Sequence, residues 1–190
     1  MNSVLLRPQV LRADIAIRPA LVAEIDTLCQ IDLDASTLFE HAGLFLELPS
    51  GHEFSVNERN RWLRSLTAGR ALLAVSAAGE PVGFAAAGTI DNEPYIDQLS
   101  VLTKFMRLGV GTALLNAVVK VSRDSGASAL WLTTYSHLSW NRPFYERQGF
   151  VVVPERDCGA EVCAVLEYER RWLPRAEERV AMRKLLGSVK

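Results

Sequence analysis

The chain has 190 residues, of which 49% are hydrophobic and 23% are charged, and its 21 basic and 22 acidic side chains leave a formal net charge of −1 at pH 7. This length fits a single domain with a sizeable core. The balanced charge argues against a nucleic-acid or anionic-membrane partner, and no apolar run approaches the length of a membrane span. We therefore expect a globular protein that works without nucleic acid or membrane.

Three cysteines, Cys29, Cys158 and Cys163, have neither the spacing of a metal clamp nor the number that a disulfide framework needs. No histidine belongs to a metal-ligand cluster, so no metal is expected. The start of the chain lacks the long apolar core and small-residue cleavage site of a signal peptide. We interpret residues 1–12 as an N-terminal extension, residues 13–190 as the domain, and the cytoplasm as its location.

The first elements are a strand, a helix and an irregular stretch. Residues 15–20 alternate and then stop at a proline, which predicts a short strand. Apolar residues at helical spacing predict a helix over residues 21–31. Residues 32–48 are half apolar without a clear period, and we expect there either a second helix around residues 36–44, broken by Gly43, or a mobile loop.

The next segment predicts a helix and a hairpin. Ser55 and Glu58 have the reciprocal spacing of a capping box, so a helix is expected from there to about Leu66. Two apolar runs, residues 71–75 and 82–87, are joined by a short turn that contains glycine, which is typical of an antiparallel hairpin.

The second half of the chain alternates strands and helices. Residues 95–101 predict a strand, residues 109–123 an amphipathic helix, and residues 129–133 a strand parallel to the first across that helix. Residues 143–148 predict a short helix, with proline in its first turn and glycine at its end. A strand is expected over residues 150–153.

The tail is ambiguous between strand and helix. It is rich in valine and leucine, as a strand would be, yet its apolar residues recur at helical spacing and its charged neighbours favour a helix. We predict a helix over residues 160–173, ended by Pro174. Apolar and other residues then alternate over residues 179–183, which predicts a final strand.

A turn with two glycines follows the strand predicted at residues 95–101. Gly109 and Gly111 lie at the mouth of the next helix. Glycines at such a position let backbone N–H groups approach an anion closely, and the helix dipole adds to the attraction. The turn is therefore either a diphosphate cradle or a tight connection whose glycines only permit packing.

Three segments resemble the GNAT superfamily of N-acetyltransferases. Leu99-Ser-Val101 followed by Gly109-Val-Gly111 at the start of a helix resembles its acetyl-CoA-binding motif, and residues 15–20 resemble its first strand. Residues 140–150, Trp-Asn-Arg-Pro-Phe-Tyr-Glu-Arg-Gln-Gly-Phe, resemble its second signature. The similarity covers roughly residues 13–154.

The resemblance implies an α/β (α+β) fold: a single GNAT-type domain with a mixed, mostly antiparallel sheet, flanked by helices, whose central parallel strand pair is splayed around the acyl-CoA site. It implies acetyl-CoA as co-substrate and a small-molecule, peptide or protein amine as acceptor, and it leaves a homodimer open. The residues that would contact acetyl-CoA are Leu99, Ser100, Val101, Met106, Arg107, Leu108, Gly109, Val110, Gly111, Thr112 and Asn141.

Two of these positions need comment. Met106 stands where the family usually has Gln or Arg, and Arg107 sits one place later. Because the family's diphosphate contacts come largely from backbone amides, the resemblance still implies a donor site here. Asn141 precedes a helix and is either its N-cap or a contact to the pantetheine arm.

Tyr145 and Asp97 are the candidate catalytic residues. By resemblance, Tyr145 lies near the thioester sulfur, where a phenol can donate a proton to the leaving thiolate; the alternative is a core tyrosine. Asp97 shares strand parity with Leu99 and Val101 and is the candidate general base; the alternative is a solvated aspartate at a strand end. Three further side chains lie in segments expected to cover the acceptor side: Glu40, His41 and Glu93.

The leading interpretation is an acetyl-CoA-dependent N-acetyltransferase that moves the acetyl group directly to an amine. The alternative is a non-catalytic acyl-CoA-binding module. Met106 and the lack of an unambiguous base favour it, whereas Tyr145 and the intact glycine turn oppose it. A dinucleotide-binding oxidoreductase is disfavoured because the turn lacks the third glycine and the downstream acidic residue. Nothing in Asp32–Ser55, the expected substrate region, selects among amine acceptors.

Overall fold

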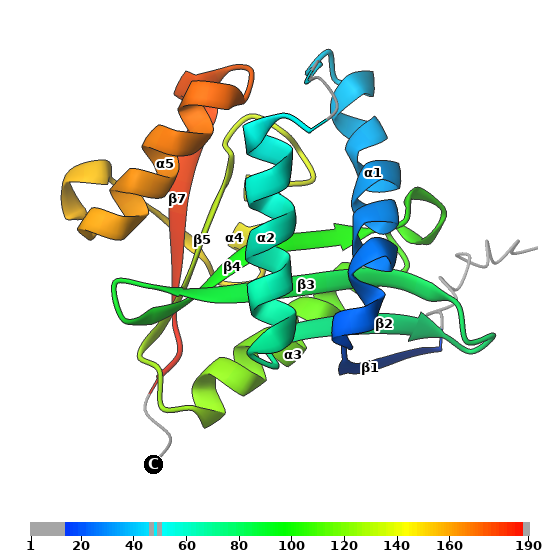
Figure 1. Ribbon diagram of the computed structural model, residues 1–190. Coiled ribbons are helices and arrows are strands. Elements are labelled where there is room, and N and C mark those ends of the chain that lie inside the picture. The colour runs from blue at the N-terminus through cyan, green and yellow to red at the C-terminus, as the bar shows by residue number, and fades with distance from the viewer. Residues whose placement is uncertain (1–13, 46–47, 49–50, 188–190) are drawn as a thin grey trace, which may run out of the picture.

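One mixed sheet organises the part of the chain that the computed structural model describes, residues 14–45, 48 and 51–187 (Figure 1). The strands are β1 (Ile15–Pro19), β2 (Ala71–Ser76), β3 (Pro81–Ile90), β4 (Glu93–Val101), β5 (Ala129–Tyr135), β6 (Val151–Val153) and β7 (Arg179–Leu185). They lie in the order β1-β2-β3-β4-β5-β7-β6, with β4 and β5 parallel and the other neighbours antiparallel. The predicted fold class is confirmed, whereas the predicted extension, residues 1–12, lies outside the described residues.

Helices cover both faces of this sheet. They are α1 (Ile25–His41), α2 (Glu53–Thr67), α3 (Val110–Asp124), α4 (Arg142–Arg147) and α5 (Ala160–Trp172), with 3-10 turns at Val22–Glu24, Thr103–Phe105, Glu155–Asp157 and Ala176–Glu178. Figure 1 shows α1 and α2 side by side in front of β2–β4, with α5 beside β7.

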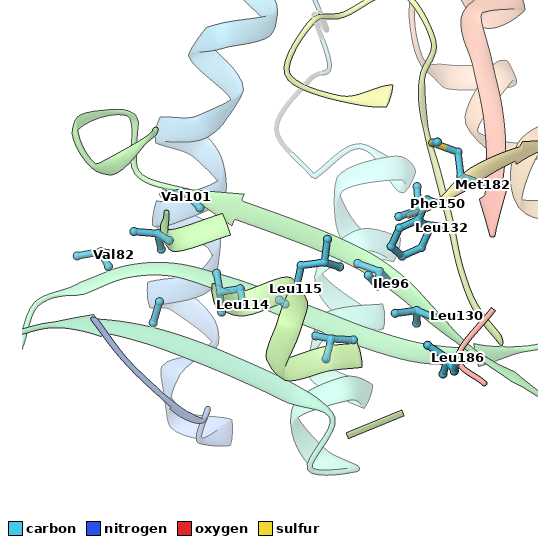
Figure 2. Packing of buried hydrophobic residues seen from close by; sticks show 14 residues of the cluster. Val82, Ile96, Val101, Leu114, Leu115, Leu130, Leu132, Phe150, Met182 and Leu186 are labelled. Carbon is cyan, nitrogen blue, oxygen red and sulfur yellow. The ribbon is translucent and has the colours of Figure 1, made fainter. Parts of the chain in front are cut away.

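Alternating side chains of β2 and β3 build a core on each face of the sheet. Ala74 and Ala85 pack against α3 in a cluster that includes Leu114, and Figure 2 shows this packing. Their neighbours Leu73 and Phe84 point to the opposite face and pack against α1 and α2. Because both faces are covered, these two strands are apolar at nearly every position instead of alternating with polar residues.

Helix α1 is longer than the sequence pattern predicted. Residues 32–41 continue the same helix to His41, so the prediction of a separate helix or loop in this segment is wrong. Its buried residues, among them Ile31 and Ala35, keep helical spacing. This helical spacing was hard to recognise in the sequence because polar side chains such as Asp32 lie next to the buried face.

Helix α2 begins two residues before the predicted start. Nδ1 of His52 accepts a hydrogen bond from the amide of Phe54 at 3.1 Å and caps the helix. Ser55 lies exposed within the first turn. The predicted capping box of Ser55 and Glu58 is therefore wrong, and the Glu58 carboxylate pairs instead with Arg61.

The remaining elements agree with their predictions. The β2–β3 hairpin forms, and β5 lies parallel to β4. The ambiguous tail is a helix, α5, followed by the strand β7. This last strand inserts between β5 and β6, where Met182 lies opposite Leu132 on one side and Val152 on the other.

A carboxylate in the β3–β4 turn caps helix α5. Asp91 accepts hydrogen bonds from the amides of Glu161 and Val162, both at 3.1 Å, and its own amide donates to the Glu161 carboxylate. This is the reciprocal arrangement of a capping box, made between two distant segments. Gly159 leaves room for it, because a Cβ at that position would lie 2.1 Å from Asp91 Oδ2.

We predict that Gly159→Ala lowers the free energy of unfolding by about 1–2 kcal/mol, the usual value of an N-cap, because the added methyl group displaces the Asp91 carboxylate. Chemical denaturation of this variant, of Asp91→Ala and of the double variant measures the effect. The costs should not add, because both changes remove the same contact. Fully additive costs, or a Gly159→Ala protein as stable as the parent, would contradict this role for Asp91.

Candidate active site

The sheet opens between β4 and β5. Their parallel register ends after two pairs, the second of which is Ile96 with Leu132. A β-bulge follows at once, because Ile96 and Gln98 pair with consecutive residues of β3 and Asp97 between them has no partner there. Beyond this point the two strands diverge, as Figure 1 shows.

Backbone amides of β4 face the resulting wedge, which we define as the opening between residues 97–101 of β4 and residues 133–135 of β5. The amide of Leu102 donates to a β3 carbonyl at 2.9 Å. Because N–H groups alternate in direction along a strand, the amides of Leu99 and Val101 point away from β3 and into the wedge. They are therefore placed to donate to a carbonyl oxygen lying there.

Helix α3 begins beside the wedge with unpartnered amides. Its first intrahelical hydrogen bond runs from the amide of Ala113 to the carbonyl of Gly109 at 2.9 Å, and no side chain caps its start. Within the described residues, no well-formed hydrogen bond uses the amides of residues 107–112. These amides and the helix dipole suit an anion such as a diphosphate, so the residues present fit a coenzyme A donor.

The turn before α3 owes its shape to two left-handed residues. Arg107 has φ 61° and Gly109 has φ 90°, and such conformations make concave groups of backbone N–H donors. Gly111 follows within the helix, where an added Cβ would lie 3.7 Å from Leu99 Cδ2 and from Phe144 Cζ. The structure therefore brings the second glycine of the motif to the place where α3, β4 and α4 meet.

The other predicted donor-site residues differ in direction. The partly buried side chain of Met106 packs against the core on the α3 side. Ser100 points to the opposite face, where its hydroxyl donates to Asp32 Oδ1 at 2.7 Å. Asn141 occupies the N-cap position of α4 without a side-chain cap bond, which leaves its amide group for a ligand.

Tyr145 packs on the sheet-facing side of α4. Its ring lies 5.1 Å from that of Phe144 and 5.7 Å from that of Phe150, measured between centroids. No hydrogen bond from the described residues engages its hydroxyl. Burial raises the pKa of this phenol to about 12, with partial opposition from Arg179, so Tyr145 is a protonated donor throughout the neutral range.

Asp97 faces the side opposite to the one that strand parity predicted. The bulge inserts one residue and reverses the alternation of side chains. Leu99 and Val101 pack on the α3 side, whereas Oδ1 of Asp97 lies 3.8 Å from Nε of Arg61 on α2. The parity argument is therefore wrong, and this candidate base belongs to the face that α1, α2 and α5 cover.

Polar side chains lie on that same face at both edges of the wedge. At the β4 edge, Asp32 of α1 accepts a hydrogen bond from Ser100 at 2.7 Å. At the β5 edge, Glu169 of α5 accepts one from Thr133 at 2.7 Å and pairs with Arg179 at 2.6 Å. We call these residues, together with Glu58, Arg61 and Asp97, the polar cluster.

Helix α2 supplies the centre of the polar cluster. Nη2 of Arg61 lies 2.7 Å from Oε1 of Glu58. Burial raises the pKa of Glu58 to about 7; Arg61 opposes this shift, and the charges of Asp32 and Glu169 add to it. Burial also raises the pKa of Asp97, against the pull of Arg61. Carboxyl groups whose pKa is perturbed in this way are often found at functional sites.

Most of the polar cluster was not predicted from the sequence. The spacing of Glu58 and Arg61, three residues apart on one helix, was an available signal of an ion pair. Asp32 follows Ile31 on the buried face of α1, and a carboxylate there requires a partner. No local signal pointed to Glu169, because its partners lie on separate strands.

The three side chains expected to cover the acceptor side are not in this cluster. Glu40 and His41 are exposed at the end of α1. Glu93 accepts a hydrogen bond from the amide of Ala129 at 3.3 Å, at the end of the β4–β5 pair that lies away from the wedge.

Comparisons with known proteins identify the family of this chain. The acetyltransferase (GNAT) family model matches residues 36–150, more than half of the chain. The chain therefore belongs to the GNAT acetyltransferase family.

Solved structures show the same fold. The PaiA N-acetyltransferase of Thermoplasma acidophilum, in complex with coenzyme A, is 17% identical with a TM-score of 0.65, over 90% of this chain and 99% of that chain. A GNAT-family acetyltransferase from Staphylococcus aureus is 17% identical with a TM-score of 0.67, over 91% and 99%. The ribosomal-protein-S18-alanine N-acetyltransferase of Escherichia coli is 14% identical with a TM-score of 0.61, over 93% and 96%.

Three further features concern the described residues alone. No helix among them is long and apolar enough to cross a membrane. No group of three His, Cys, Asp or Glu side chains in these ranges is arranged to hold a metal ion. All three cysteines are free.

We predict that Thr112→Glu lowers the affinity for coenzyme A by about tenfold or more, roughly 1.4 kcal/mol, because it adds a carboxylate beside the unpartnered amides. The matched control is Asn116→Glu, which adds the same charge to an exposed position one turn further along α3. Calorimetric titration with coenzyme A compares the two. Equal effects of both substitutions would contradict the assignment of the cradle.

Proposed function

We propose that this GNAT-family protein transfers the acetyl group of acetyl-CoA directly to the primary amine of an acceptor. The observation that carries the proposal is the wedge, where unpartnered amides at the start of α3 adjoin one face and the polar cluster lies on the other. An anionic thioester donor suits the first face and an ammonium acceptor suits the second. The bound coenzyme A of the Thermoplasma acidophilum structure supports a donor of this kind.

Each residue group has a definite task in this proposal. The amides of residues 107–112 bind the diphosphate. The amides of Leu99 and Val101 donate to the thioester carbonyl oxygen, on which negative charge develops. The Tyr145 hydroxyl donates a proton to the departing sulfur. When bound, acetyl-CoA supplies the activated acyl group, and these residues orient it and stabilise the charges.

The alternative is a module that binds acyl-CoA without catalysis. The inward direction of Met106 favours it, because this position then lacks the side-chain contact usual in the family. The partly exposed carboxylates over the wedge oppose it, because a binding module for the donor alone has no use for proton acceptors on the acceptor face. Glu58 and Asp97 therefore favour the enzyme.

A thiol-release assay decides between the two. Purified protein is mixed with acetyl-CoA and one class of amine in each reaction. The classes are primary alkylamines, amino acids, diamines, and peptides carrying a free N-terminus or a lysine. Free coenzyme A should accumulate with at least one class, in step with acetylated amine detected by mass spectrometry. Tight binding of acetyl-CoA with no acetylated product in any class would support the non-catalytic module.

We predict that Tyr145→Phe lowers the single-turnover rate of acetyl transfer by about a hundredfold or more, the usual value of a positioned acid, while coenzyme A affinity and thermal stability change little. The substitution keeps the ring and its contacts with Phe144 and Phe150 and removes only the donor. Rapid-quench measurement separates the chemical step from product release. A variant that transfers acetyl at the parent rate would make Tyr145 a packing residue.

A further inference from the structure

The position of Glu58 follows from its two charged neighbours. Its carboxylate lies within electrostatic reach of both Asp32 and Glu169. Asp32 is bonded to Ser100 on β4, and Glu169 is bonded to Thr133 on β5. Those two strands form the edges of the wedge. Arg61, which pairs with Glu58 at 2.7 Å, lies 3.8 Å from Asp97 at the bulge where the strands part, so Glu58 lies beside the opening.

Other contacts hold this part of α2 in place. Nδ2 of Asn57, the preceding residue, donates to the hydroxyl of Tyr168 on α5 at 3.0 Å. The Phe54 ring stacks on the same tyrosine, with centroids 5.8 Å apart. Helix α2 is therefore fixed against α5 where it carries Glu58, and the ion pair with Arg61 holds the carboxylate on the side of Asp97.

Charged groups from four elements face the Glu58 carboxylate. Arg61 pairs with it from its own helix, and Asp32 of α1 and Glu169 of α5 act on it as like charges. From β4, Asp97 shares Arg61 with it. Burial and the two like charges oppose ionisation of Glu58 more than its single direct cationic partner, Arg61, favours it, so this group is suited to take up a proton near neutral pH.

We propose that Glu58 is the proton acceptor for the ammonium group of the acceptor, and that Asp97, the strand carboxylate, positions Arg61. This inference rests on the proposed acetyl transfer. The side chain of Glu58 is 21% exposed, against 10% for Asp97, so Glu58 is the more open of the two to an incoming substrate. Asp97 also has a second cation, Arg64, acting on it, which favours its ionised state and reduces its basicity.

Every proton in the proposed transfer has a donor and an acceptor. The acceptor ammonium gives one proton to the Glu58 carboxylate, which later releases it to water. The neutral nitrogen forms a bond to the acetyl carbon, and the carbon–sulfur bond breaks. The Tyr145 hydroxyl gives its proton to the departing thiolate and regains one from the nitrogen. The products are the acetylated amine, free coenzyme A and one proton.

The first test measures Glu58 itself, without turnover. Protein labelled with 13C at glutamate side-chain carboxyl carbons is titrated by NMR, and the Glu58 signal is assigned by its loss in Glu58→Gln. We expect this signal to titrate with an apparent pKa near 7, because burial and two like charges raise the pKa of this carboxyl group. A midpoint at the ordinary glutamate value, roughly 4.3, would overturn the inference whatever the enzyme's activity.

The second test measures acetyl transfer against pH with two small amines. n-Propylamine is protonated at pH 7, whereas 2,2,2-trifluoroethylamine is largely neutral there because its fluorines withdraw electrons. With n-propylamine, Glu58→Gln should lose about a hundredfold or more in rate at pH 7, and the rise of wild-type rate through pH 7 should disappear. With trifluoroethylamine, which has no proton to give up before attack, the same variant should keep most of its activity.

Control variants show whether the effect on rate is specific to Glu58. Glu53→Gln removes the same charge from an exposed position in the first turn of α2 and should leave both rates and the pH profile unchanged. An unchanged pH profile in Glu58→Gln would overturn the assignment. So would a rise of rate through pH 7 that disappears in Asp97→Asn but not in Glu58→Gln. A wild-type protein that acetylates no amine in the broader panel contradicts the proposed function instead, and the NMR titration then decides on Glu58 alone.

Discussion

The separation of β4 from β5 is the constraint on which the rest of the structure depends. Parallel pairing ends at Ile96 and Leu132, and the bulge at Asp97 turns the strand immediately afterwards. Among the described strands the other neighbours remain paired, so this opening leaves backbone N–H groups of β4 without a strand partner. Unpaired amides in a protein interior are costly, and a ligand that accepts hydrogen bonds from them offsets that cost.

The two faces of the wedge have different chemistry because different helices cover them. On one face, α3 contributes a glycine turn and its own unpartnered amides, with Tyr145 of α4 nearby. On the other, α1, α2 and α5 each contribute a charged side chain that would be destabilising in a closed core. The bulge connects the two, because it rotates Asp97 out of the row of Leu99 and Val101 and toward Arg61. One inserted residue therefore divides the face of the proposed donor site from the face of the proposed acceptor site.

Local sequence patterns predicted those features that local geometry determines. The hairpin, the helix beginning near Gly109 and the final strand could be predicted from apolar spacing and from glycine, and the parallel pair from the helix between its strands. Helix α1 was predicted too short because polar residues such as Asp32 obscure its period, although their partners lie across the domain. The start of α2 was misplaced because His52, a less common cap, replaces the expected Ser55.

The candidate site also has one part that local sequence predicted and one part that it did not. The donor turn is a continuous segment, so its glycines were visible in the sequence. The polar cluster is assembled from α1, α2, β4, β5, α5 and β7, and its members meet only in the folded chain. The face on which Asp97 lies could not be predicted, since a bulge depends on how β3 and β4 pair. A pattern of period two gives the wrong face after any such insertion.

Hydrogen exchange at the start of α3 tests the central claim most directly, namely that the wedge and its unpartnered amides bind the acetyl donor. The amides of residues 107–112 lack well-formed hydrogen bonds within the described structure, so they should exchange rapidly in the free protein. Saturating coenzyme A should slow exchange there and at Leu99 and Val101, while the outer strands β1 and β2 stay unchanged. Exchange at residues 107–112 that remains equally fast in the saturated protein would contradict the account.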